Sequence, residues 1–123
     1  MTDADWIQNV VTAFYDKAKT DVLIGYHFRI ITDFDAHIPR ISAFWELQLL
    51  GRTQKILAEP FDVMKAHVPL GIKRGELGRW LVLFRKTLDE EVKTQPEFAG
   101  LKDLWLEKLG FFEGVFLRYF GFK

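Results

Sequence analysis

Apolar residues recur every three or four positions along most of this chain, and this spacing limits its fold more than any other feature. The first such segment, residues 6–18, follows Thr2 and Asp5, which have the spacing of a helix-capping box. Comparable segments cover residues 34–49, 77–88 and 101–120. No segment alternates apolar and polar residues over the length of a strand. The sequence therefore predicts an all-α protein.

Capping and helix-breaking residues predict where these helices begin and end. Thr32 and Asp35 repeat the capping spacing before the second long segment, and Gly51 is expected to end it. Pro39 lies inside that segment, where the missing backbone N–H costs about 3 kcal/mol and should kink the helix. The last two helices are expected to start near Glu76 and Pro96.

A short corner is expected between the first two long helices. Asp21 can cap a turn there, and Gly25 is expected to break it. Tyr26, His27 and Phe28 follow at the corner. We expect His27 to lie near the surface.

The composition predicts one domain, residues 1–123, with an interior lined by rings. Aromatic residues make up 15% of the chain, with 12 Phe, 4 Trp and 3 Tyr. Such an interior suits either a flat aromatic ligand or an ordinary Phe-rich core. The 17 basic residues balance 17 acidic ones, which gives no electrostatic reason to expect a nucleic acid or a membrane as partner.

The absence of cysteine excludes disulfides, iron–sulfur clusters and zinc–thiolate sites. The acidic amino terminus has the features of neither a secretory signal nor a transit peptide. The most apolar run, residues 109–117, is interrupted by Glu113 and is far shorter than the roughly 20 residues needed to span a bilayer. We expect a cytoplasmic protein.

His67 is the candidate functional residue with the most distinctive surroundings. Pro69 lacks a backbone N–H and restricts the residue before it, so the helix predicted for residues 61–66 should end close to His67. Its apolar neighbours are Met64, Leu70 and Ile72. An imidazole in this setting suits a strong bond to the iron of a bulky apolar cofactor. Haem b is the candidate, and without cysteine pairs it would be held non-covalently.

Several short motifs occur in an order and spacing that resemble a known family. They are Phe14-Tyr15, Gly25 with Phe28, residues 33–37 running into residues 40–45, residues 49–51, His67-x-x-Leu70, and residues 79–84 with Trp80 and Phe84. In this arrangement, from about residue 10 to residue 120, the chain resembles a truncated haemoglobin of group III. The resemblance implies a globin-like, two-over-two helical sandwich.

The resemblance also implies roles for particular residues. His67 would be the proximal iron ligand, while Tyr15, His37 and Trp80 would stabilise a gas on the distal side. Phe28 would pack flat on the porphyrin, and Arg40 could meet a haem propionate. Other implied cofactor contacts or pocket walls are Phe14, Ile41, Phe44, Trp45, Met64, Leu70, Ile72 and Phe84. For Trp45 and Phe84, packing in the core is the favoured role.

Two positions depart from the family pattern. Family members usually carry an aromatic residue ahead of the proximal helix and another three residues before the tryptophan. The chain has Ile56 and Leu77 there. Neither departure removes a candidate iron ligand, but both affect how tightly the pocket would hold haem.

The implied function is binding of O2 and of other small ligands such as NO, CO and cyanide. The Tyr15 phenol could donate a hydrogen bond to such a ligand and slow its release, which suits O2/NO chemistry better than oxygen transport. NO dioxygenase-like or peroxidase-like turnover would need a separate reductase, since no flavin or nicotinamide motif occurs. His37 could donate to the ligand, act as a gate, or bind the iron itself.

Other functions remain as alternatives. A cofactor-free helical interaction module would explain the helical pattern, and it would be colourless. A haem-based gas sensor would need an output domain, and we expect none from this sequence. A zinc hydrolase is disfavoured because the chain has 3 histidines in all and no H-E-x-x-H motif.

Overall fold

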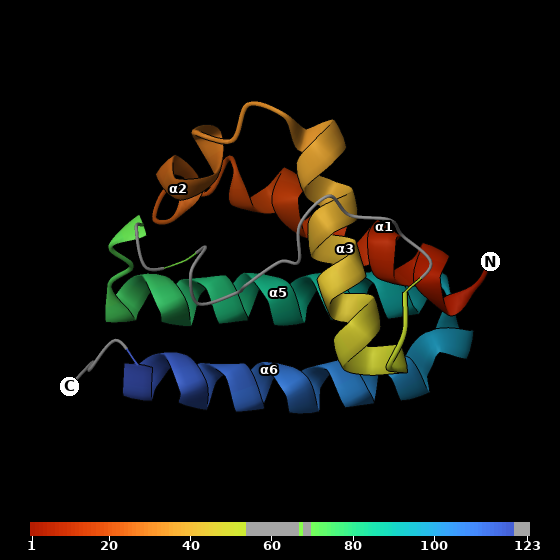
Figure 1. Cartoon of the computed structure of the whole chain (residues 1–123). Helices are drawn as coiled ribbons and strands as arrows, with labels where there is room; N and C mark the ends of the chain where they lie inside the picture. Colours follow the sequence, from red (N-terminus) through yellow and green to blue (C-terminus); the bar gives the residue numbers. More distant parts are fainter. Residues whose placement is uncertain (54–66, 68–69, 120–123) are drawn as a thin grey trace.

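The computed structural model describes residues 1–53, 67 and 70–119, and this part of the chain is all-helical, which confirms the predicted class (Figure 1). The predicted helix over residues 61–66, with Met64, and the positions of Ile56 and Phe120 lie outside the described residues. The elements are α1 (Asp3–Ala18), α2 (Gly25–Arg29), α3 (Phe34–Leu50), α5 (Arg74–Thr94), the 3-10 helix η2 (Pro96–Phe98) and α6 (Ala99–Tyr119). None of the described helices is both long and apolar enough to cross a membrane.

The first helix begins at the predicted capping box. The Thr2 side chain accepts the Asp5 backbone N–H at 3.1 Å, and the Asp5 carboxylate accepts the Thr2 N–H at 3.0 Å. The predicted apolar face of α1 is buried: Trp6, Ile7, Val10, Val11, Phe14, Tyr15 and Ala18. Tyr15 therefore enters the interior from the last turn of α1.

The predicted break at Gly25 is wrong, because α2 begins there. Asp21 does cap the preceding turn, since its carboxylate accepts the backbone N–H groups of Leu23 and Ile24 at 3.0 and 3.2 Å. A Cβ at Gly25 would lie 3.0 Å from the carbonyl oxygen of Lys19. Glycine thus lets the start of α2 approach the end of α1 closely, a tertiary requirement that local sequence patterns do not reveal.

The third helix begins one residue away from the predicted cap. Asp33, not Thr32, caps it, because the Asp33 carboxylate accepts the Ala36 N–H at 3.1 Å. The helix continues through Pro39 and ends, as predicted, at Gly51, which adopts the left-handed conformation with φ of 73°.

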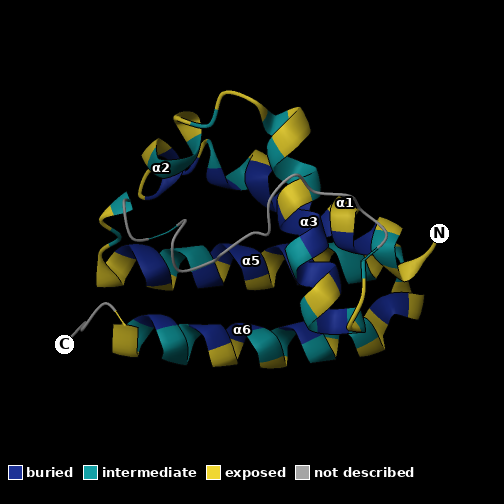
Figure 2. Ribbon diagram, in the orientation of Figure 1, coloured by how far each residue is buried: buried dark blue, intermediate teal, exposed yellow. Residues whose placement is uncertain are grey.

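The long helices enclose one aromatic core. Helices α5 and α6 run side by side in opposite directions, and α3 crosses them (Figure 1), while α1 contacts both α3 and α5. The buried faces of these helices turn toward one another (Figure 2). Trp6 stacks on Phe98 of η2 with ring centroids 5.1 Å apart, and Trp45 of α3 lies 5.4 Å from Trp105 of α6. These ring contacts join α1 to η2 and α3 to α6 within the core.

Candidate functional site

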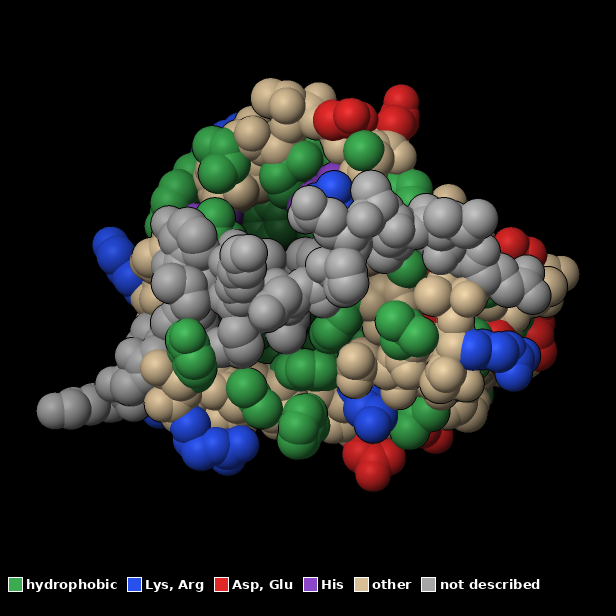
Figure 3. All heavy atoms as spheres, in the orientation of Figure 1, with side chains coloured by type: hydrophobic (Ala, Val, Ile, Leu, Met, Phe, Trp, Pro, Cys, Tyr) green, Lys and Arg blue, Asp and Glu red, His purple; other side chains and the backbone are tan. Residues whose placement is uncertain are grey.

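A cavity of about 200 Å³ lies between α1, α2, α3, α5 and α6, and its lining is mainly apolar. All 3 histidines of the chain line it. Figure 3 shows the surface hollowed among hydrophobic side chains on this face. The lining residues are Tyr15, Ile24, His27, Phe28, Ile30, Ile31, His37, Ile41, Phe44, Trp45, His67, Leu70, Ile72, Glu76, Leu77, Trp80, Phe112 and Phe116.

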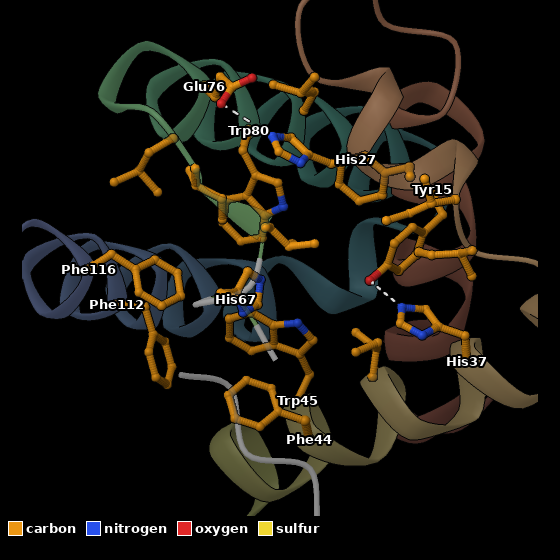
Figure 4. A pocket seen from close by; sticks show the side chains of 18 residues that line it. Tyr15, His27, His37, Phe44, Trp45, His67, Glu76, Trp80, Phe112 and Phe116 are labelled. Carbon is orange, nitrogen blue, oxygen red and sulfur yellow. Dashed lines mark hydrogen bonds and ion pairs between the residues drawn. The ribbon is translucent and has the colours of Figure 1, made fainter. Parts of the chain in front are cut away.

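Tyr15 and His37 form a polar pair in this cavity. The Tyr15 hydroxyl lies 3.1 Å from His37 Nε2, and the two rings meet edge to face with centroids 5.3 Å apart (Figure 4). Burial raises the pKa of the Tyr15 phenol above its ordinary value, so the hydroxyl keeps its proton at neutral pH. Burial, with the positive charges of Arg40 and His67, lowers the pKa of His37. The pair is therefore neutral and supplies a phenolic donor.

His67 lies in the same cavity and away from the Tyr15–His37 pair. Its ring centroid is 5.2 Å from that of Phe116, with the planes tilted by 47°. In Figure 4, Tyr15 and His37 lie on one side of the view, and His67 lies on the other with Phe112 and Phe116. The structure thus brings together three polar residues that the sequence analysis selected.

Glu76 makes a second polar group with Tyr26 and His27. The Glu76 side chain is buried, with the Tyr26 hydroxyl donating to Oε2 and the Lys73 backbone N–H donating to Oε1 at 2.9 Å. His27 Nε2 lies 3.2 Å from Glu76 Oε1 (Figure 4). Burial alone would raise the pKa of Glu76, but the hydrogen bond from Tyr26, then the Lys73 N–H and His27, lower it overall.

The prediction that His27 lies near the surface is wrong. Its side chain is only 9% exposed and lines the cavity. The reason is its partner, Glu76, which is itself buried and belongs to α5. A buried carboxylate needs hydrogen-bonding or charged partners, and α2 supplies two of them, Tyr26 and His27.

Most of the predicted pocket residues line the cavity, although some do not. Phe28, Ile41, Phe44, Leu70, Ile72 and Trp80 line it. Trp45, for which packing in the core was favoured, is 4% exposed and lines the cavity as well. Phe14 and Phe84 lie behind the lining, where both rings contact Trp80 at 5.5 and 5.2 Å. Arg40 is exposed, and Met64 lies outside the described residues.

Sequence reasoning missed several lining residues. They are Ile24, Ile30, Ile31, Glu76, Phe112 and Phe116. The four-residue spacing of Phe112 and Phe116 does place them on the apolar face of the last helix, but nothing in that spacing shows that the face opens onto a cavity. Glu76 has no local signal at all beyond its place in the first turn of α5.

Comparison with protein-family models, with curated proteins and with solved structures finds no match for this chain. Within residues 1–53, 67 and 70–119, no three or more His, Asp or Glu side chains form a group able to hold a metal ion. The site is thus a mainly apolar, ring-lined cavity with three imidazoles and two polar clusters. Such a cavity suits a flat apolar ligand that takes a bond from a single imidazole.

Proposed function

We propose that this chain is a haem protein in which the cavity holds haem b and His67 binds the iron. One observation carries the proposal: His67 and the Tyr15–His37 pair line the same apolar cavity and are separated across it (Figure 4). The ring-rich walls suit the face of a porphyrin, and one imidazole suffices to hold its iron. The residues present therefore fit the cofactor.

The arrangement of helices supports a two-over-two globin-like architecture as part of this proposal. The pair α1 and α3 packs together, and so does the antiparallel pair α5 and α6. Tyr15 and His37 come from the first pair, while Trp80, Phe112 and Phe116 come from the second. A group lying between the two pairs would meet the polar residues on one side and aromatic rings on the other.

Haem held there would supply an iron that binds O2, NO, CO or cyanide. The chain itself supplies the polarity around that ligand. The Tyr15 hydroxyl, which keeps its proton, can donate a hydrogen bond into the cavity, and His37 holds that hydroxyl at 3.1 Å. The walls of the cavity are mainly apolar, and apolar surroundings strengthen such a hydrogen bond.

Slow release of oxygen is the expected result. A hydrogen bond to a partly charged acceptor contributes about 1.5–3 kcal/mol, equivalent to a tenfold to hundredfold slower escape. We therefore assign the site to O2/NO chemistry rather than to oxygen transport, with a separate reductase as electron donor.

Replacement of His67 by glycine, followed by rescue with imidazole, tests the assignment. The wild type and a His37→Gln variant should retain haem and show a Soret band, whereas His67→Gly should lose the cofactor on gel filtration. Free imidazole should restore retention in His67→Gly, because it can occupy the space of the deleted ring. Normal haem content in His67→Gly without imidazole would contradict the assignment, and a colourless wild type would favour a cofactor-free interaction module.

A further inference from the structure

The polar group formed by Tyr26, His27 and Glu76 is not used by the proposed gas-binding arrangement. Glu76 is 6% exposed, and its two carboxylate oxygens receive the Tyr26 hydroxyl and the Lys73 backbone N–H. The only side chain of the group that could add a positive charge is His27, 3.2 Å away. The guanidinium of Arg79, in the same helix as Glu76, forms an ion pair with Asp21 instead, with Nη2 2.8 Å from Oδ1.

Glu76 determines which nitrogen of His27 carries the proton. His27 Nε2 lies 3.2 Å from Glu76 Oε1, within ion-pair distance but without the alignment of a hydrogen bond. The negative charge of the ionised carboxylate, which is only an acceptor, favours a proton on the nitrogen nearer to it, Nε2. In the neutral imidazole the lone pair then lies on Nδ1. Among the described residues, Nδ1 has no hydrogen-bond partner, and the side chain lines the cavity while being 9% exposed. The cavity thus contains a basic nitrogen backed by a buried carboxylate.

His37 does not offer the same free lone pair. Its Nε2 lies 3.1 Å from the Tyr15 hydroxyl, whose raised pKa keeps the phenol protonated. Because the proposed function has that hydroxyl donate to a ligand, His37 Nε2 must carry a proton and donate to the hydroxyl oxygen, so this nitrogen is not a base. His27 has no equivalent partner at Nδ1 among residues 1–53, 67 and 70–119.

We propose that His27, positioned by Glu76, is the proton acceptor of this cavity, and that the cavity takes small weak acids such as hydrogen cyanide in their neutral form. This inference rests on the proposed haem function, because ferric haem binds such ligands as anions. When a neutral acid HX enters, the X–H bond breaks and its electron pair stays on X. The proton forms an N–H bond at His27 Nδ1, and Glu76 compensates the resulting imidazolium charge. His27 would contact the ligand, whereas Glu76 acts through His27 as a positioning residue.

The rate of cyanide binding to the ferric protein, measured by stopped flow, tests the proposal. His27→Gln keeps a side chain that can donate to Glu76 but lacks a basic nitrogen, so cyanide association near neutral pH should slow at least tenfold. Carbon monoxide binding to the ferrous protein involves no proton and should stay within about twofold of the wild type, which serves as the internal control. Glu76→Gln should slow cyanide association as well, and should alter its pH profile.

The protonated nitrogen of His27 can be observed without haem. A long-range proton–nitrogen NMR spectrum of the uniformly labelled apo-protein should show His27 protonated at Nε2, and this preference should weaken in Glu76→Gln. A proton on Nδ1 in the neutral wild type would overturn the inference whatever the haem content.

The outcomes distinguish a failure of the inference about His27 from a failure of the proposed haem function. Normal haem retention with an unchanged cyanide rate in His27→Gln would overturn the role of His27 alone and leave the haem proposal in place. Failure of the wild type to bind haem would overturn the proposed function, and the weak-acid inference would fall with it. A selective loss of cyanide association together with the Nε2 proton supports both.

Discussion

Individual residues account for the difference between the two polar clusters of the cavity. At one, Tyr15 and His37 form a neutral pair, because burial raises the pKa of the phenol and lowers that of the imidazole. At the other, Glu76 is held ionised by hydrogen bonds and lies beside His27. The same apolar cavity thus presents a phenolic donor at one place and a carboxylate–imidazole group at another.

Replacement of Tyr15 by phenylalanine tests the phenolic donor. We expect oxygen to dissociate about tenfold faster or more from the ferrous, haem-loaded variant, which corresponds to the loss of one hydrogen bond. Stopped-flow release gives the rate. Tyr119→Phe makes the same chemical change at an exposed position of α6 and should leave the rate unchanged. Unchanged release in Tyr15→Phe would transfer the donor role to His37 or Trp80.

The pH dependence of stability tests the environment of His37. Because its pKa is lowered in the folded state, the unfolded chain takes up a proton first as the pH falls. Stability from this group is therefore complete above about pH 6.5, the ordinary histidine value, and declines as the pH falls from there through the lower folded value. Urea unfolding of apo-protein between pH 8 and pH 5, compared for wild type and His37→Gln, should show a shallower decline in the variant. Identical slopes would contradict the buried, neutral assignment.

The ends of helices were predictable where they depend on residues that are close in the sequence. The capping box at Thr2 and the left-handed Gly51 were predicted, because each satisfies backbone groups within three or four positions. The cap of α3 was wrong by one residue because Asp33 offers an equivalent acceptor beside Thr32. Gly25 was misread as a break because its role depends on the carbonyl oxygen of Lys19, which belongs to the end of another helix.

Replacement of Gly25 by alanine tests this close approach between α1 and α2. The added Cβ would lie 3.0 Å from the carbonyl oxygen of Lys19 and 3.2 Å from that of Ala18, so this backbone must shift by a few tenths of an ångström, and we expect a loss of about 1–3 kcal/mol in the free energy of unfolding. Gly110→Ala is the matched control, since a Cβ there meets nothing within 4 Å in α6, and it should stabilise by roughly 0.5–1 kcal/mol. Chemical denaturation measures both. Equal effects at the two positions would contradict the role given to Gly25.

Across the whole molecule, the sequence indicated the class of fold and part of the site. The helical spacing of apolar residues was enough to predict the all-α class, because this spacing is a local property of the sequence. Tyr15 and His37 were chosen from the order of motifs and His67 from its local surroundings, and all three line one cavity. The position of His27 was not predictable, because its environment depends on α5, and the Tyr26–Glu76 hydrogen bond beside it joins residues 50 positions apart. Contacts over such separations leave no periodic signal in one sequence.

An absorption spectrum of the purified full-length protein, titrated with haem and then reduced under carbon monoxide, tests the central proposal most directly. Binding through His67 predicts saturation at one haem per chain, a Soret band in the oxidised protein, and a shifted Soret band in the reduced, carbon monoxide-treated protein. A titration without a saturating Soret change, or one that saturates equally in His67→Gly without imidazole, would contradict the proposal that this imidazole holds haem in the cavity.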